Sequence, residues 1–151
     1  MADKEIIMSV KDLVVKFELR GRTLTAIREA SLDLYKGESL AIVGESGAGK
    51  SVFTKAFMGL LDDNGWIDSG NIIYKGEDLA KYETEKDWLK IRGKEIAMVF
   101  QEPMTSLNPL RTIGSQIEES IELHRGLKGR AAKKLVLEIL NDVGITEPER
   151  R

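Results

Sequence analysis

The sequence contains no cysteine among its 151 residues, and this absence excludes several kinds of chemistry at once. Disulfide bonds, thiol catalysis and metal sites built from thiolates all require cysteine, so none of them operates here. A chain without cysteine suits a reducing compartment, and the cytosol is the expected one.

The sequence also lacks an excess of charge of either sign and any long hydrophobic run. It has 23 Lys and Arg against 25 Asp and Glu, a net charge of -2, so nucleic acid is not expected as a partner. The N-terminal residues Met1–Glu5 include charged side chains of both signs and lead into only a short apolar run, so the pattern predicts neither a signal peptide nor a membrane span. Any association with a membrane is expected to come through a partner protein.

What is present is the composition of a globular domain, with 42% apolar and 32% charged residues. Apolar residues recur with a period near two over Ile6–Leu19 and again over Leu24–Leu34, which predicts an antiparallel pair of strands. Two continuous apolar runs, Leu40–Val43 and Ile96–Phe100, predict strands that are buried on both faces of a parallel sheet.

Helical spacing of apolar residues occurs in three other segments. The spacing over Phe53–Leu60 predicts an amphipathic helix that ends near Asp62–Gly65. Two further helices are predicted over Ile113–Ile121 and Ala132–Val143, with Gly144 as the stop of the second. The chain therefore combines strands and helices in its first part and contains helices alone in its last part.

A glycine-rich loop joins the first predicted buried strand to the first predicted helix. Its sequence, Gly44–Ser51, fits the P-loop pattern G-x-x-x-x-G-K-[ST] between a strand and a helix, which is the context that gives the pattern meaning. The glycines allow successive backbone N–H groups to converge on one anion, and the helix dipole points to the same place. Lys50 adds a full charge near the β and γ phosphates, and the Ser51 hydroxyl is expected to hold Mg²⁺. The loop predicts binding of a nucleoside triphosphate.

The segment Met98–Pro103 distinguishes between classes of P-loop protein. Together with Gly44–Ser51 it resembles the Walker A and Q-loop pair of ABC transporter ATPases, at a spacing typical of that family. Gln101 follows an apolar run, and ligands in open α/β sheets lie beyond the carboxyl ends of the strands. The resemblance implies that Gln101 reaches the Mg²⁺ and the attacking water.

A longer string indicates which group of ABC transporter ATPases the chain resembles. Phe100–Pro109 is similar to the Q-loop region of the ATPases that serve oligopeptide, dipeptide and nickel importers, and Gly44–Gly47 has the form that those subunits use. The resemblance covers essentially the whole chain. It implies the ATP-binding subunit of a bacterial ABC importer for peptides, in which binding and hydrolysis of ATP drive transport across the membrane.

The resemblance also assigns roles to single residues. Lys50 and Gln101 are the implied catalytic residues, and Ser51 and Gln101 are the implied ligands of Mg²⁺. Phe17 matches the position where the family places an aromatic ring against adenine, although an aromatic residue on a strand can equally be part of the core. The residues implied to bind ATP are Phe17, Gly44, Glu45, Ser46, Gly47, Ala48, Gly49, Lys50, Ser51 and Val52.

The expected fold is α/β, a P-loop NTPase core of the ABC ATPase type with an N-terminal antiparallel β subdomain and the start of a helical subdomain. We expect residues 1–102 to form the ATP-binding core with the β subdomain, and residues 103–151 to begin the helical subdomain. The resemblance implies that the signature loop and the Walker B strand lie downstream of Arg151, so the domain is expected to be incomplete. The chain by itself is then expected to bind nucleotide but to hydrolyse ATP negligibly.

The resemblance further implies partners. In the family two ATPase subunits enclose two ATP molecules, so a second ATPase subunit, identical or different, is expected. Transmembrane permease subunits, and indirectly an extracytoplasmic substrate-binding protein, are expected as well, with the chain at the cytoplasmic face of the membrane. His124 lies upstream of the family's switch histidine and is expected to be a helix-surface residue.

Two other functions stay open at this point. One is a small P-loop kinase or GTPase, although the sequence contains neither an Asn-Lys-x-Asp string nor an apolar run ending in Asp. The other is a non-catalytic module that binds a nucleotide and a partner protein.

Overall fold

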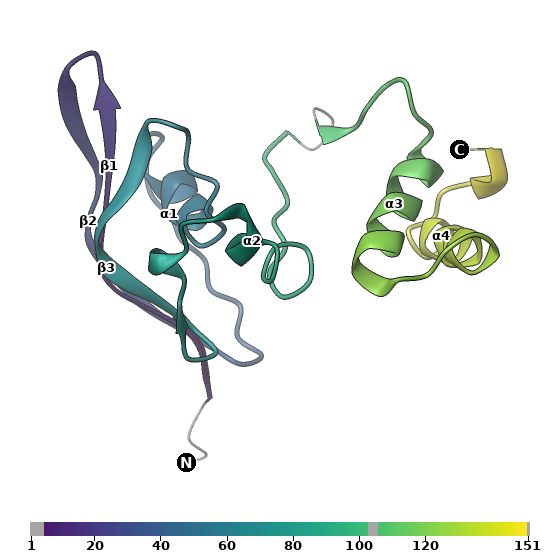
Figure 1. Cartoon of the computed structure of the whole chain (residues 1–151), viewed down its shortest axis with the longest axis horizontal. Helices are drawn as coiled ribbons and strands as arrows, with labels where there is room; N and C mark the ends of the chain where they lie inside the picture. The colour runs from purple at the N-terminus through teal and green to yellow at the C-terminus, as the bar shows by residue number, and fades with distance from the viewer. Residues whose placement is uncertain (1–4, 103–105, 151) are drawn as a thin grey trace. The chain divides into compact units, whose positions relative to one another are not determined.

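The computed structural model describes residues 5–102 and 106–150 of the chain (Figure 1). The chain divides into two compact units, Met1–Arg92 and Gly93–Arg151. The expected subdomain boundary at Pro103 lies outside the described residues, and the functional division into residues 1–102 and 103–151 stays a prediction.

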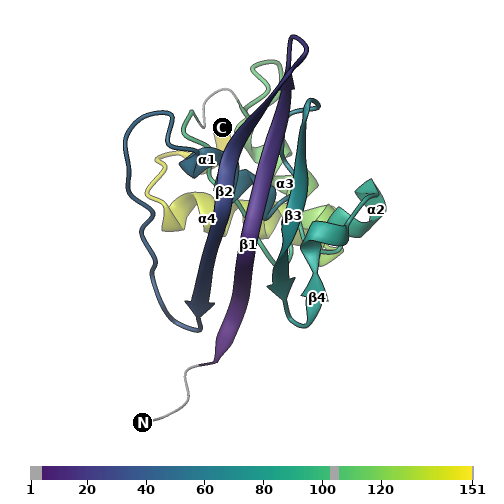
Figure 2. The same ribbon diagram turned by 90° about the vertical axis from the view of Figure 1, so that its left-hand side faces the viewer.

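An antiparallel sheet with the strand order β2-β1-β3-β4 organises the first unit (Figure 2). Between the first two strands, Arg20 and Gly21 have φ values of 48° and 76°, as a two-residue hairpin turn of type I′ requires. The predicted antiparallel strand pair is confirmed, because β1 and β2 are paired along their length. The strands are β1 (Ile6–Leu19), β2 (Arg22–Tyr35), β3 (Gly65–Tyr74) and β4 (Glu77–Asp78).

Helical segments lie on one face of this sheet (Figure 1). They are α1 (Lys50–Ala56), the 3-10 turn η1 (Leu79–Lys81) and α2 (Glu85–Trp88). Leu13 and Val15 of the central strand β1 are fully buried, and Phe53 and Ala56 of α1 are buried with them. Burial of such side chains stabilises a fold by about 1.5–3 kcal/mol each, so this apolar layer fixes α1 to the sheet.

The two predicted parallel strands are wrong for the described structure. Leu40–Val43 and Ile96–Phe100 run as mostly irregular backbone, and Val43 and Val99 are 87% and 90% exposed. A parallel strand is stable only when neighbouring strands accept its hydrogen bonds and both its faces are covered. Within residues 5–102 and 106–150 all strands belong to the antiparallel sheet, and Ile96 forms only an isolated bridge. The apolar pattern indicates a preference for burial, and without neighbours it does not produce a strand.

The helix that follows the P-loop is shorter than the predicted Phe53–Leu60, because a glycine ends it. Gly59 has a φ of 58°, in the left-handed region, and its N–H donates to the Ala56 carbonyl at 3.3 Å. The Leu60 N–H donates to the Lys55 carbonyl at 3.0 Å, which completes a Schellman motif. The helical turn therefore closes at Gly59, before the predicted stop near Asp62–Gly65.

Two helices form the second unit, as predicted: α3 (Ile113–Arg125) and α4 (Arg130–Asp142). Their shared core consists of four buried residues, Ile121, Ala132, Val136 and Leu140. The Thr112 hydroxyl caps α3 by accepting the Ser115 N–H at 3.2 Å. Gly144 stops α4, since its N–H donates to the Asn141 carbonyl at 2.9 Å. A short 3-10 turn, η3 (Pro148–Arg150), follows.

Asp78 fastens the turn at the edge of the sheet, and its side chain is 10% exposed. Oδ1 accepts the backbone N–H groups of Ile72 at 3.0 Å and Ala80 at 3.2 Å. Oδ2 accepts from Asn71 Nδ2 at 2.7 Å and lies 3.4 Å from Lys81 Nζ. Burial raises the pKa of Asp78, but the hydrogen bonds from these donors outweigh burial and hold the pKa below its usual 3.8.

We expect Asp78→Asn to lower the free energy of unfolding by about 1–2 kcal/mol near neutral pH, because an amide NH₂ cannot accept the bond from Asn71. A depressed folded-state pKa gives stability that is present above the unfolded-state pKa and is lost as the pH falls through the folded value. In urea titrations the difference between the two proteins should stay constant down to about pH 4 and shrink below it. The exposed Asp63→Asn is the control, and a difference that widened in acid would contradict the assignment.

Candidate functional site

The P-loop, Gly44–Ser51, leads without regular structure into α1, which begins at Lys50. Its backbone bends at Gly47, where φ is 81°, and at Gly49, where φ is 83°. The Ala48 N–H donates to the Glu45 carbonyl at 3.2 Å and closes a turn at the tip of the loop. Since backbone that alternates between right- and left-handed conformations orients successive N–H groups toward a common anion, the left-handed Gly47 and Gly49 on either side of Ala48 give the loop a form suited to phosphate.

Lys50 folds back over this loop. Its Nζ donates to the Gly44 carbonyl at 2.8 Å and to the Glu45 carbonyl at 2.6 Å. Both acceptors are neutral, so these contacts hold the ammonium at the loop without neutralising its charge. No side chain caps the first turn of α1, whose first N–H groups have no partner within the helix.

Gly49 brings the loop into direct contact with β2. A Cβ atom at this position would lie 2.8 Å from Ile27 Cδ1 and 2.9 Å from the Ala26 carbonyl oxygen. Together with the positive φ, these contacts leave no room for a side chain. Packing against β2 and the positive φ therefore both require glycine at the position before Lys50.

A pocket of about 490 Å³ opens between this loop and the end of the sheet. Of the residues predicted to bind ATP, it brings together Phe17 and the stretch Gly47–Val52. Gly44, Glu45 and Ser46 are exposed and lead into the pocket, and two of them accept the bonds from Lys50. The remaining lining residues are Leu19, Leu24, Thr25, Ala26, Asp62 and Asn64.

Phe17 lies near the end of β1, between two paired strands. It is half-buried, and its backbone partners are Leu24 on β2 and Gly65 on β3. Its ring lies directly against Gly65, because a Cβ there would be 2.5 Å from Phe17 Cε1. Phe17 therefore both packs against the sheet and lines the pocket, and its predicted contact with adenine stays a prediction.

Sequence patterns did not indicate the polar residues of the pocket, Asp62 and Asn64. Asn64 Nδ2 donates to the Glu18 carbonyl at 2.8 Å, and the Glu18 N–H donates to the Asn64 carbonyl at 2.9 Å. Asp62 lies 3.3 Å from Lys55 Nζ. The sequence suggested only a turn at these residues, because nothing local shows that this turn returns to β1.

Gln101 belongs to the second unit. It is exposed and lines a hollow of about 430 Å³ with Phe100, Glu102 and Ser106. Its predicted role beside the Mg²⁺ and the attacking water stays a prediction. His124 is exposed in the last turn of α3, as expected for a helix-surface residue.

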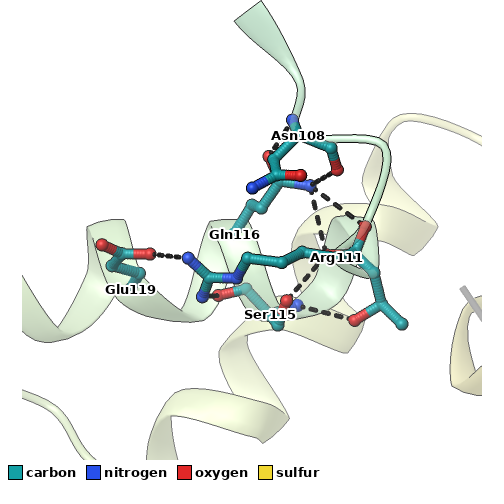
Figure 3. A network of polar contacts seen from close by, with 6 residues as sticks. Asn108, Arg111, Ser115, Gln116 and Glu119 are labelled. Carbon is teal, nitrogen blue, oxygen red and sulfur yellow. Dashed lines mark hydrogen bonds and ion pairs between the residues drawn. The ribbon is translucent and has the colours of Figure 1, made fainter.

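The loop that precedes α3 is held by the side chain of Gln116 (Figure 3). Gln116 Oε1 accepts the Asn108 N–H at 2.9 Å, and Gln116 Nε2 donates to the carbonyls of Asn108 at 3.1 Å and Arg111 at 3.3 Å. Arg111 also forms an ion pair with Glu119. The end of the Phe100–Pro109 string and the residues that follow it are therefore held to α3 in a defined turn.

A family described as "ABC transporter" matches residues 27–151 of the chain. This match favours a transport ATPase over the kinase or GTPase that the P-loop alone left open. No helix in the described part of the chain is long and apolar enough to cross a membrane.

Curated relatives match the chain along nearly its whole length. The oligopeptide transport ATP-binding protein AmiE of Streptococcus pneumoniae is 52% identical over 149 residues, which are 99% of the chain and 42% of that protein. OppD of Bacillus subtilis, an oligopeptide transport ATP-binding protein, is 47% identical over 96% of the chain and 40% of its own length. The dipeptide transport ATP-binding protein DppD of the same organism is 45% identical over 97% of the chain and 44% of its own length. The chain spans less than half the length of these relatives.

The solved structures that resemble the chain include two of the cassette MJ0796. The dimeric ATP-binding cassette MJ0796 bound to ADP and Pi has a TM-score of 0.73 at 26% identity, covering 89% of the chain and 56% of that structure. Another dimeric structure of MJ0796, a bacterial ABC transporter cassette, has a TM-score of 0.74 at 25% identity with the same coverage. The predicted fold class, that of an ABC ATPase cassette, is confirmed.

Proposed function

Since the chain belongs to the ABC transporter family, we propose that the pocket between β1, β2 and the P-loop binds ATP, and that the whole protein is the ATP-binding subunit of a peptide importer. The observation that carries the proposal is the pocket, which Phe17 and Gly47–Val52 line together. An aromatic ring and a phosphate-binding loop in one pocket match the two ends of a nucleotide.

The loop Gly44–Val52 is the proposed site of the phosphates. Backbone N–H groups of Gly47–Val52 supply hydrogen bonds, and Gly44, Glu45 and Ser46 shape the entry to the loop. Lys50 Nζ now bonds to two neutral carbonyls, and phosphate oxygens are stronger acceptors because both partners of the bond are then charged. A bound triphosphate therefore replaces the loop carbonyls as the partner of Lys50.

The proposed ligands of Mg²⁺ are the Ser51 hydroxyl and Gln101, together with phosphate oxygens. Ser51 is exposed and lines the pocket, which fits this role. In the described ranges no group of three or more His, Asp or Glu side chains could hold a metal ion. This fits Mg²⁺, which is commonly bound by few protein groups plus substrate phosphates and which neutralises their charge.

Lys50 and Gln101 are the proposed catalytic residues. Transfer of a phosphoryl group depends on positioning and on stabilising the charge that develops on the γ-phosphate. Lys50 supplies a positive charge at the loop, and Gln101 orients the attacking water. Phe17 is proposed to stack on the base, since its half-buried ring rests on Gly65 and also lines the pocket.

The proposed setting of the whole protein follows its relatives. Relatives named as oligopeptide and dipeptide transport ATP-binding proteins support a peptide as cargo. Dimeric solved structures support a second ATPase subunit as partner. Permease subunits would then hold the protein at the cytoplasmic face of the membrane, and a substrate-binding protein would deliver the cargo to them.

Photolabelling with 8-azido-ATP tests where the nucleotide binds. Because the reactive group is on the base, we expect labelled peptides to contain Phe17 or Leu24, which line the sheet side of the pocket. Excess ATP should prevent labelling, and so should inorganic tripolyphosphate, which competes for the P-loop. If residues outside the pocket were labelled and excess ATP prevented that labelling, the proposed site would be contradicted.

A further inference from the structure

A neighbouring side chain that lines the pocket requires glycine at position 65, and the backbone conformation of Gly65 does not. A Cβ at this position would be 2.5 Å from Phe17 Cε1 and 2.9 Å from Phe17 Cδ1 and Cζ. These separations are far below the 3.5–4.0 Å at which carbon atoms attract each other. Gly65 is not among the glycines with positive φ, so its backbone accepts other residues. The Phe17 ring is the group that excludes a side chain at this position.

Asn64 fixes the strand ends on which this contact depends. Its side-chain Nδ2 donates to the Glu18 carbonyl at 2.8 Å, and its own carbonyl accepts the Glu18 N–H at 2.9 Å. These two bonds join the residue before Gly65 to the residue after Phe17. They hold the paired positions Phe17 and Gly65 in register, at the point where β3 begins.

The consequence concerns the pocket. Because position 65 carries no side chain, the Phe17 ring can lie against β3 while it lines the pocket together with Leu19 and Leu24. A methyl group at position 65 would displace the ring from this place. Stacking depends on ring position, since a gap of about 0.5–1 Å already forfeits a quarter to a half of the dispersion energy.

We propose that Gly65 and Asn64 are positioning residues, which set the Phe17 ring where the base of the nucleotide stacks. The inference rests on the proposed function. It predicts that these two residues affect the binding of the base and not the binding of the phosphates, because neither of them belongs to the P-loop.

Calorimetric titrations of the full chain with MgATP and with inorganic tripolyphosphate separate the two effects. For Gly65→Ala we expect the Kd for ATP to rise about tenfold, the scale of one base–aromatic stack, and the Kd for tripolyphosphate to stay unchanged. Phe17→Ala should show the same selective loss. Combining it with Gly65→Ala should add little, because both changes remove one interaction. Ser69→Ala, at an exposed position of the same strand, is the control and should change neither Kd.

Asn64→Ala provides a second variant, in case Gly65→Ala does not fold by circular dichroism. It removes the side-chain bond to Glu18 and keeps the backbone bond, and we expect a smaller but equally selective loss of ATP affinity, about threefold. Equal losses for ATP and tripolyphosphate, or no change for ATP, would overturn the positioning role. If the unmodified chain bound neither compound, the proposed function itself would fail. The two failures are therefore distinguishable.

Discussion

Replacing Lys50 by alanine is expected to raise the Kd for ATP about a hundredfold or more. The variant loses a charged donor to the phosphates, and hydrogen bonds with charged groups contribute about 1.5–3 kcal/mol each. A loss near 2.7 kcal/mol corresponds to a factor of about one hundred in Kd. Calorimetric titration with MgATP measures the change directly. In cells, the same substitution in the whole protein is expected to abolish uptake of a labelled oligopeptide.

The fold should survive this substitution. Gly44 and Glu45, whose carbonyls accept the bonds from Lys50, are exposed, so water replaces the ammonium at little cost. We expect the free energy of unfolding to change by less than about 0.5 kcal/mol. Lys86→Ala is the control, because it removes the same charge from an exposed position of α2 outside the pocket lining. A similar loss of ATP affinity in both variants would show that total charge matters and that the P-loop contact does not.

The features that could be predicted from the sequence depend on neighbouring residues in the chain. The strand pair β1 and β2 is joined by the turn at Arg20 and Gly21, so its pairing needs no distant partner. The P-loop pattern likewise contains within a few residues the glycines that bend the loop and the lysine that folds over it. Local information is sufficient for both.

The features that could not be predicted depend on distant contacts. Leu40–Val43 has the composition of a buried strand, but strand formation requires neighbours, and the described residues supply none to it. Asn64 enters the pocket through a bond to Glu18 that spans 46 residues. No period or motif in the sequence encodes that approach. The contact follows from the register of β1 and β3, which places Asn64 beside Glu18.

Arg92 fastens the end of α1 to the segment that follows α2, and its side chain is 21% exposed. Its Nε donates to the Met58 carbonyl and its Nη2 to the Gly59 carbonyl, both at 2.7 Å. Nη1 bonds to both carboxylate oxygens of Glu85 at 2.9 and 3.0 Å, and the guanidinium lies 5.3 Å from the centre of the Trp88 ring. One side chain therefore donates to the carbonyls of the turn that follows α1. The helix dipole also favours a positive charge at this end of α1.

We expect Arg92→Ala to lower the free energy of unfolding by about 2–3 kcal/mol, because two helix-end carbonyls lose a charged donor and the Trp88 ring loses its cover. Arg92→Lys should recover less than half of this loss, since a single ammonium cannot reach both carbonyls and Glu85 in the planar geometry of a guanidinium. Urea unfolding followed by tryptophan fluorescence measures both variants. Arg28→Ala, at an exposed position of β2, is the control. Full recovery by lysine would show that charge alone matters, and the carbonyl-capping geometry would then not be what stabilises the end of α1.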